Sequence, residues 1–454
     1  MNKFAVILAA GKGTRMKSDK DKVLHPLLGK PMISHVIDNL EGLNLTKKVV
    51  VISDGREDIK SLLKNEVDFV VQHERLGTGH AVKMTRELLE KEIGTTLVIC
   101  GDTPLIKSET IAKLFEIHQS NQADITILST TVKEPYGYGR IVRNDNNEVV
   151  KIVEEKDATI EEKLITEINT GTYCFNNQLL FQSLLELKND NAQNEYYLTD
   201  VVKVVSAHGG KICAYITFDE EETLGINDRV ALEKANRILK CRVNEKLMQN
   251  GVTIIDRNNT YISVDTVIGK DTTIYPGTIC MGKNIIGNNC DIGPNTQLEN
   301  ITIGNNVNVC QSVITDCTIG NNTKVGPFAH FRNQSVIGDN VRIGNFVEVK
   351  NTKIDKYSKA AHLSYIGDAE IGKNVNVGCG SITVNYDGKN KYQTIIKDNV
   401  FVGCNSNLIA PVTIAENAYI AAGSTINRDV PSDSLAIARS KQENKVGYAK
   451  KYRK

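Results

Sequence analysis

The sequence lacks tryptophan altogether, and aromatic residues make up only 6% of its 454 positions. It also lacks a net charge, since 55 Lys and Arg face 54 Asp and Glu, so no global field is available to grip nucleic acid. No run of eighteen consecutive apolar residues occurs, so no membrane-spanning helix is predicted. What is there, 41% hydrophobic and 24% charged residues, is typical of globular domains and excludes wholesale disorder or a coiled-coil rod.

The ten cysteines also lack the two-residue spacing of a zinc or thioredoxin-type site. They are scattered from Cys100 to Cys404, which predicts free thiols in a reducing cytosol and hence a cytoplasmic protein. The apolar segment at residues 4–10 leads into a glycine-rich turn rather than a cleavage site, so we predict a strand entering a loop and not a signal peptide.

The first half of the chain alternates short β-branched runs with stretches of helical period. Such alternation is typical of βαβ units and predicts a Rossmann-like α/β domain over residues 1–228, with a mostly parallel sheet covered on both faces. An amphipathic linker helix is predicted over residues 229–250, because apolar residues recur there three or four apart. The predicted strands lie at residues 4–8, 48–52, 69–72, 96–100 and 125–131, and the predicted helices at 32–43, 80–92 and 108–119.

A six-residue period replaces the helical period beyond residue 250. Ile-Gly pairs recur six residues apart, as at Ile286 and Ile292, and isoleucine also returns every sixteen to eighteen residues. Sets of three hexapeptides describe the coils of a left-handed parallel β-helix over residues 251–454, with the aliphatic residues pointing inward. About ten coils, each rising about 4.8 Å, would give a prism about 45 to 50 Å long.

A glycine-rich turn at residues 8–16, Leu-Ala-Ala-Gly-Lys-Gly-Thr-Arg-Met, follows the first predicted strand. It is not a P-loop, because no Gly-Lys-Ser/Thr closes it, and not a dinucleotide fingerprint, because Met16 stands at the third glycine position. Small residues still let backbone N–H groups approach phosphates, and Arg15 and Lys22 add two cations. Asp102 follows a later strand, where a hard oxygen ligand for Mg²⁺ belongs.

This turn resembles that of the sugar-nucleotide pyrophosphorylase family, and the family's later motifs follow in the same order, among them Gln72 with Gly77-Thr78. The resemblance implies that Arg15 and Lys22 are catalytic and that Asp102 and Asn227 hold Mg²⁺. It assigns nucleotide and UDP-sugar binding to Leu8, Ala9, Ala10, Gly11, Lys22, Gln72, Gly77, Thr78, Gly139, Glu154, Asn169 and Asn227.

Together with the hexapeptide repeat, the whole chain resembles the bifunctional N-acetylglucosamine-1-phosphate uridylyltransferase / glucosamine-1-phosphate N-acetyltransferase family. The resemblance implies acetylation of glucosamine 1-phosphate by acetyl-CoA, then transfer of UMP from UTP to N-acetylglucosamine 1-phosphate with release of pyrophosphate. The UDP-N-acetylglucosamine formed would supply peptidoglycan and other cell-envelope precursors. A homotrimer through the β-helix is also implied, with small-molecule substrates and neither nucleic acid nor membrane as partners.

Acetyl transfer to an amine needs a base, and the β-helix holds only two histidines, His330 and His362. The segment around His362 resembles the family's catalytic-histidine segment. After Gly380 the six-residue period breaks, which predicts a loop outside the coil at residues 385–392. The resemblance assigns sugar-phosphate binding to Arg332, Lys350, Tyr365 and Asn376, and acetyl-CoA binding to Cys379, Asn385, Tyr386, Cys404, Ala422 and Arg439.

Two features depart from the family pattern or stay open. Cys404 stands where many members have serine, as a weaker hydrogen-bonding group, a site for alkylation or a small filler. Residues 439–454 carry seven basic residues and one acid, so this tail either attracts coenzyme A phosphates or serves as a solubilising end. With no tryptophan in the chain, the family's C-terminal aromatic contact has no counterpart of that type.

Two other functions fit the same architecture. One is a single-activity sugar-nucleotide pyrophosphorylase whose β-helix is structural or allosteric, and the His362 segment and the predicted loop argue against it. The other is a non-catalytic scaffold built from the same two modules, which Arg15, Lys22 and Asp102 argue against. Release of free thiol and of pyrophosphate, followed separately, discriminates among the three.

Overall fold

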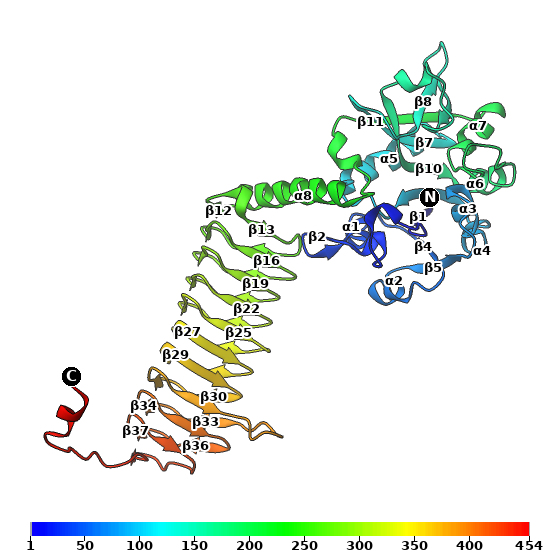
Figure 1. The fold of residues 1–454 in the computed structure, drawn as a ribbon. Coiled ribbons are helices and arrows are strands. Elements are labelled where there is room, and N and C mark those ends of the chain that lie inside the picture. The colour runs from blue at the N-terminus through cyan, green and yellow to red at the C-terminus, as the bar shows by residue number, and fades with distance from the viewer. Residues whose placement is uncertain (1, 454) are drawn as a thin grey trace. The chain divides into compact units, whose positions relative to one another are not determined.

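A computed structural model describes residues 2–453, so Lys454 of the basic tail lies outside them (Figure 1). The chain divides into two compact units between Leu239 and Lys240. The division falls inside helix α8 (Arg229–Gln249), which occupies the stretch where the linker helix is predicted. No helix in residues 2–453 combines the length and the apolar character that crossing a membrane requires.

The first unit is built on a nine-stranded sheet. Strands β1, β4, β5 and β6 run parallel, so their carboxyl ends meet at one edge. Strand β10 runs antiparallel to β6 and β7, so the expected parallel sheet is interrupted where the hairpin β8–β9 reverses the chain. The order is β11 (Ile212–Thr217), β7 (Ile125–Thr131), β10 (Glu167–Asn176), β6 (Gly94–Cys100), β1 (Asn2–Leu8), β4 (Lys47–Ser53) and β5 (Asp68–Gln72), with β8 (Arg140–Arg143) and β9 (Val149–Val153) attached to β10.

Helices cover both faces of this sheet. Successive residues of β1 point to opposite faces and therefore pack into two different cores. Phe4 and Val6 belong to one apolar core, and Ala5 and Ile7 belong to the other. The helix predicted at residues 80–92 is broken in two, and at the break the buried Thr85 hydroxyl donates to the Val82 carbonyl oxygen at 2.7 Å. The helices are α1 (Met32–Asp38), α2 (Glu57–Leu62), α3 (Thr78–Lys83), α4 (Arg86–Leu89), α5 (Ser108–Ser120), α6 (Asn177–Ser183) and α7 (Asp200–Ala207).

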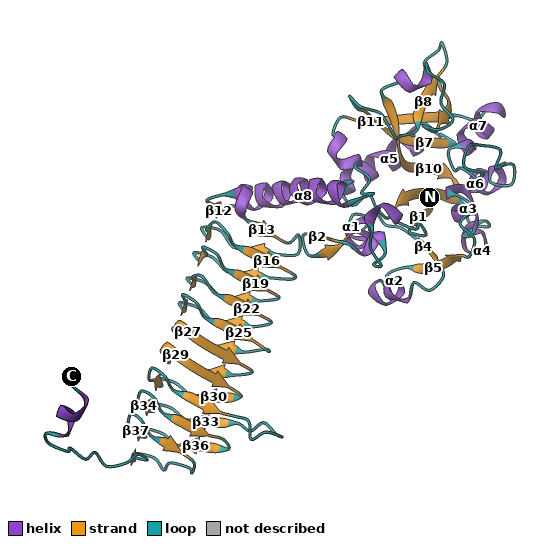
Figure 2. Cartoon of the chain, viewed as in Figure 1, coloured by secondary structure: helices purple, strands orange, loops and turns teal. Residues whose placement is uncertain are grey.

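The second unit is a parallel β-helix, and its strands dominate the cartoon in Figure 2. One face is a nine-stranded sheet in which a buried isoleucine of each coil stacks on that of the next, as Ile268 does on Ile286. This is the inward-facing set that the six-residue period predicts. The strands of this face are β14 (Val267–Ile268), β17 (Ile285–Ile286), β20 (Thr302–Ile303), β23 (Thr318–Ile319), β26 (Val336–Ile337), β28 (Lys353–Ile354), β30 (Ala369–Ile371), β33 (Thr394–Ile396) and β36 (Val412–Ile414).

The other two faces form one nineteen-stranded sheet, because β27 and β29 run continuously around the corner between them. Residues 385–393 leave the coil between β32 and β33 and form the predicted projecting loop, closed by a bridge between Tyr386 and Lys391 (Figure 1). The strands are β12 (Thr253–Ile254), β13 (Tyr261–Ile262), β15 (Thr273–Ile274), β16 (Ile279–Met281), β18 (Asp291–Ile292), β19 (Gln297–Glu299), β21 (Asn308–Val309), β22 (Val313–Thr315), β24 (Lys324–Val325), β25 (His330–Arg332), β27 (Arg342–Lys350), β29 (Lys359–Gly367), β31 (Asn376–Val377), β32 (Ile382–Val384), β34 (Phe401–Val402), β35 (Asn407–Ile409), β37 (Tyr419–Ile420), β38 (Thr425–Ile426) and β39 (Leu435–Ala436).

Candidate functional sites

A cavity of about 350 Å³ lies at the carboxyl ends of β1, β5 and β6 in the first unit. The turn after β1 lines it, and a Cβ atom added to Gly11 would meet nothing within 4 Å, so the backbone there is open to a ligand. The predicted residues at this cavity are Leu8, Ala9, Ala10, Gly11, Lys22, Gln72, Gly77, Thr78 and Asp102.

Two cations and two oxygen donors converge beside this cavity. The Lys22 ammonium pairs with the Asp102 carboxylate and donates to the Asn227 amide oxygen at 3.1 Å. The Arg15 guanidinium donates to the same amide oxygen at 2.9 Å. Residues as far apart in sequence as Arg15 and Asn227 therefore form the single cluster that the motifs predict.

The oxygen atoms of Asp102 and Asn227 fit a magnesium ion, because both already contact one positively charged nitrogen. Mg²⁺ prefers oxygen ligands and usually keeps water and phosphate oxygens in its remaining positions, so two protein ligands suffice. Within residues 2–453 there is no cluster of three or more His, Cys, Asp or Glu that could hold a metal ion.

The Gln72 side chain is buried and held in one orientation. Its amide nitrogen donates to the Gly77 carbonyl oxygen at 3.1 Å and contacts His80 Nδ1 at 3.0 Å. Burial lowers the pKa of His80 and so favours the neutral ring, in which Nδ1 can accept this hydrogen bond. Gly77 has φ of 106°, and a Cβ there would lie 2.6 Å from the Tyr196 carbonyl oxygen, so only glycine fits.

Gly139, Glu154 and Asn169 also lie together. The Asn169 backbone N–H donates to the Gly139 carbonyl oxygen at 2.9 Å, and a Cβ on Gly139 would lie 3.5 Å from the Glu154 carboxylate. Burial raises the pKa of Glu154, whose carboxylate accepts from the Thr199 hydroxyl at 3.2 Å. Thr199 is a neighbour that the sequence motifs did not single out.

Arg75 is a further residue that the sequence motifs did not single out. It lines the first cavity, and its Nε donates to the Ala10 carbonyl oxygen at 3.1 Å. The sequence marks Arg75 only as a basic residue between Gln72 and Gly77, which belong to one motif of the resembled family.

The second group of predicted residues lies along one corner of the β-helix. His362 pairs in register with Asn345, and its Nδ1 lies 2.8 Å from the Asn345 amide oxygen. Backbone hydrogen bonds of 2.7 Å from Gly380 to Leu363 and from Asn405 to Cys379 then place Cys379 and Cys404 on the next two coils of the same corner.

Ala422 continues this column, since the Gly423 N–H donates to the Cys404 carbonyl oxygen at 2.8 Å. The Arg439 guanidinium donates to the Ala422 carbonyl oxygen at 2.8 Å. The structure therefore brings the predicted base and four predicted acetyl-CoA residues onto one corner. Tyr386 is not among them, because its hydroxyl donates to Gly388 within the projecting loop.

The predicted sugar-phosphate residues lie beside this corner. Lys350 aligns with Arg332 on the preceding coil and pairs with Asp368 at 3.3 Å. Asn385 donates to the Asp368 carboxylate and reaches the Tyr365 hydroxyl at 3.4 Å, so the loop joins the cluster. The pKa of Asp368 is lowered. Burial alone would raise it, but hydrogen bonds from Asn351 and Asn385 and the charge of Lys350 outweigh burial.

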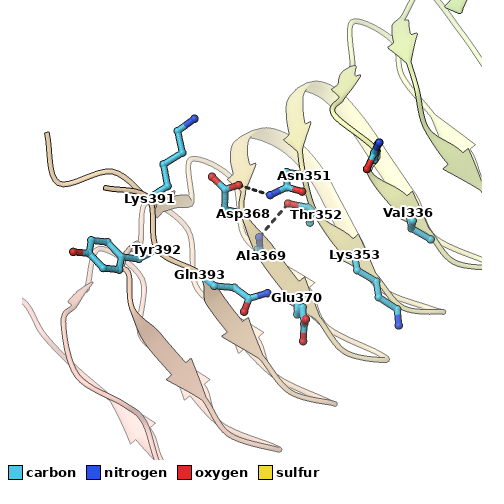
Figure 3. Close-up of a pocket in the computed structure, with 11 residues that line it drawn as sticks. Val336, Asn351, Thr352, Lys353, Asp368, Ala369, Glu370, Lys391, Tyr392 and Gln393 are labelled. Carbon is cyan, nitrogen blue, oxygen red and sulfur yellow. Dashed lines mark hydrogen bonds between the residues drawn. The ribbon is translucent and has the colours of Figure 1, made fainter. Parts of the chain in front are cut away.

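Asn376 lies across the corner from Tyr365, because it pairs with Lys359 at the start of β29. Lys391 of the loop was not predicted, and contact with the Lys350 ammonium lowers its pKa. Figure 3 shows Lys391 and Asp368 lining a cavity of about 580 Å³ next to Asn351. Two adjacent ammonium groups suit an anion.

Comparison with known proteins decides the family. A protein of Exiguobacterium sibiricum named "Bifunctional protein GlmU" is 55% identical over 448 residues, which are 99% of this chain and 100% of the relative. A Bacillus subtilis protein of the same name is 54% identical over 452 residues, 100% of this chain and 99% of the relative. The chain belongs to the bifunctional GlmU family. It is therefore a bifunctional enzyme of UDP-N-acetylglucosamine synthesis, with a nucleotidyltransferase and an acetyltransferase activity.

Models of three smaller families match in the same order as the two units. The nucleotidyl transferase model matches residues 4–221, the "GMPPB C-terminal domain" model matches 254–364, and the bacterial transferase hexapeptide model, with six repeats, matches 393–428. Membership of the GlmU family and these matches agree with an α/β unit followed by a hexapeptide β-helix.

Proposed function

We propose that the cavity of the first unit binds UTP and N-acetylglucosamine 1-phosphate and that UMP transfer takes place beside it. The observation that carries this proposal is the convergence of Arg15, Lys22, Asp102 and Asn227 next to an open glycine-rich turn. The sugar phosphate attacks the α-phosphorus of UTP and pyrophosphate leaves, so no protein nucleophile is required. Gln72 offers its amide oxygen to the uracil, and Glu154 and Asn169 accept or donate hydrogen bonds to the sugar.

Charge stabilisation is the main task of the protein side chains in this reaction. Arg15 and Lys22 hold the phosphate oxygens on which negative charge develops. Asp102 and Asn227 would hold Mg²⁺, which when bound supplies additional neutralisation of the phosphates. Asp102 also pairs with the Lys22 ammonium, so the same carboxylate would orient both this ammonium and the magnesium ion.

For acetyl transfer we propose that His362 accepts the proton of the attacking glucosamine amine. An amide oxygen only accepts, so the 2.8 Å contact with Asn345 places the proton on Nδ1 and leaves Nε2 free as the base. Arg332 and Lys350 bind the sugar phosphate, and the corner column with Cys379, Cys404, Ala422 and Arg439 holds acetyl-CoA.

One assay tests both halves of this proposal. The full-length protein is incubated with glucosamine 1-phosphate, acetyl-CoA, UTP and Mg²⁺, and free thiol and pyrophosphate are followed separately. We expect both products, with pyrophosphate release depending on prior acetylation and on Mg²⁺. A single-activity pyrophosphorylase with a structural β-helix would instead release no thiol from acetyl-CoA and glucosamine 1-phosphate. It would still release pyrophosphate when N-acetylglucosamine 1-phosphate is added.

We also propose that the β-helix forms a homotrimer and that the enzyme is cytoplasmic. Phe328, Phe346 and Leu363 occupy successive steps of the His362 corner with φ of 59°, 56° and 37°, a conformation that bulky residues rarely adopt. They are 51%, 56% and 59% exposed, and the two phenylalanine rings stack at 5.3 Å. An exposed apolar column held in a strained conformation is typical of an interface.

Light scattering of the full-length protein tests the trimer. Phe346→Asn suits the left-handed backbone better than phenylalanine does, so it should fold normally and yet dissociate the trimer. We expect acetyl transfer to fall with the mass while uridylyl transfer continues. A wild-type monomer with full acetyltransferase activity contradicts the proposal.

A further inference from the structure

Arg75 lies in the loop between β5 and α3, at the mouth of the nucleotide cavity. Arg75 is exposed, yet two hydrogen bonds hold its guanidinium in place. Nε donates to the Ala10 carbonyl oxygen and Nη2 donates to the Ser53 hydroxyl, both at 3.1 Å. These contacts use one hydrogen on each of two nitrogens, so three of the five guanidinium hydrogens remain available to a ligand.

Among residues 2–453, Arg75 has no ion-pair partner for its positive charge. The comparison is with Arg56, which also contacts the Ser53 hydroxyl but forms an ion pair of 2.9 Å with the buried Asp21. Arg75 forms no ion pair with a carboxylate of residues 2–453, although Asp102 and Glu195 line the same cavity. Asp102 is committed to Lys22.

We propose that Arg75 is a further nucleotide-binding residue and that it contacts a phosphate oxygen of UTP. The proposal rests on the nucleotide site proposed above. Its guanidinium is anchored to Ala10, the residue before the open Gly11, and is therefore next to the turn that receives the phosphates. Phosphate is the only anionic part of the nucleotide, and a planar guanidinium matches its oxygen atoms. Uracil and ribose carry no charge that could neutralise it.

Kinetics of Arg75→Gln in the full-length protein test this proposal. We expect KM for UTP to rise about tenfold, the lower end of what a charged hydrogen bond contributes, because the residue is exposed. KM for N-acetylglucosamine 1-phosphate and the rate of acetyl transfer should not change. Arg75→Lys keeps the charge without the planar fork and should fall between the two. Arg86→Gln makes the same chemical change at a partly exposed ion pair between Arg86, the first residue of α4, and Glu90, and it should leave KM for UTP unchanged.

Competitive inhibition by uridine and by UMP identifies the part of the nucleotide that Arg75 contacts. If Arg75 contacts a phosphate, Arg75→Gln weakens the binding of UTP and also that of UMP or pyrophosphate. The Ki of uridine then stays the same. If uridine weakens as much as UTP does, Arg75 contacts the nucleoside and the proposal is wrong. It is equally wrong if Arg75→Gln leaves KM for UTP unchanged, or lowers only the melting temperature. Absence of uridylyl transfer by the wild-type protein would instead overturn the proposed nucleotide site.

Discussion

The two candidate sites differ in how far a single chain completes them. In the first unit the charged groups are already paired inside a cavity, with the side chains of Lys22 and Asp102 only 14% and 17% exposed. In the β-helix the proposed base His362 is exposed on a corner, and the nearby Arg332–Glu348 pair is 36% and 35% exposed. Water weakens charge interactions at the second site more than at the first. We therefore expect the second site to need a cover, which a neighbouring subunit of the proposed trimer would supply.

The largest effect is expected at the exposed site of the β-helix. His362→Ala removes the proposed base, so acetyl transfer should slow by about 10² to 10⁴-fold, and uridylyl transfer should not change. Separate thiol and pyrophosphate measurements check this. The matched control is His330→Ala, because His330 is the other histidine of the β-helix and is also exposed. Unchanged thiol release in His362→Ala would remove this residue as the base.

Asp102→Ala is the corresponding test of the cavity site in the first unit. The change removes a proposed oxygen ligand of Mg²⁺ and the partner of Lys22, which together are worth several kcal/mol, so uridylyl transfer should fall by about 10³-fold. Acetyl transfer should stay near normal because the β-helix is a separate unit. A folded variant that loses both activities would show that the sites are not independent.

The sequence predicts the elements that repeat or that end at a sheet edge. Isoleucines of the β-helix point inward as expected, because a six-residue period assigns each position directly to a face. Asp102 and the turn after β1 meet because carboxyl ends of parallel strands lie at one edge.

Contacts between coils were harder to predict. Asn345 lies seventeen residues before His362, one coil away, and the sequence alone does not show which residues on neighbouring coils meet. The role of Asp368 depends on Lys350 and Asn385 arriving from a different coil and from the loop, and β10 reverses direction because of a hairpin. Such long-range contacts depend on loop lengths and not on local pattern.

Alkylation gives a smaller effect that also separates the two sites. Cys404 is exposed on the His362 corner, whereas burial raises the pKa of the Cys280 thiol to about 12 and that of Cys317 to about 11, so those thiols react slowly. Iodoacetamide should therefore lower acetyl transfer about tenfold, with protection by acetyl-CoA, an estimate for one obstructed contact. Cys404→Ser should be active and should resist the reagent. Equal inactivation of Cys404→Ser would move the effect to another thiol, with Cys379 on the adjacent coil the first to examine.

The smallest predicted effect concerns the pH dependence of sugar binding at Glu154 in the first unit. Burial raises the pKa of Glu154 above its ordinary value of 4.5, helped by the charges of Asp200 and Asp157 and opposed by the hydrogen bond from Thr199. As the pH falls through this raised value, Glu154 gains a proton and can no longer accept two hydrogen bonds as a carboxylate. KM for N-acetylglucosamine 1-phosphate should then rise a few-fold as the pH is lowered from neutral toward 4.5, a loss of about 1 kcal/mol. A raised carboxyl pKa means that the folded state binds this proton more tightly than the unfolded state, so Glu154 adds stability as the pH falls. The rise in KM should therefore appear without a fall in melting temperature caused by this residue. Glu154→Gln, which is neutral at every pH, should start with the higher KM and show a flatter profile, and an unchanged profile in that variant would assign the pH dependence to another group.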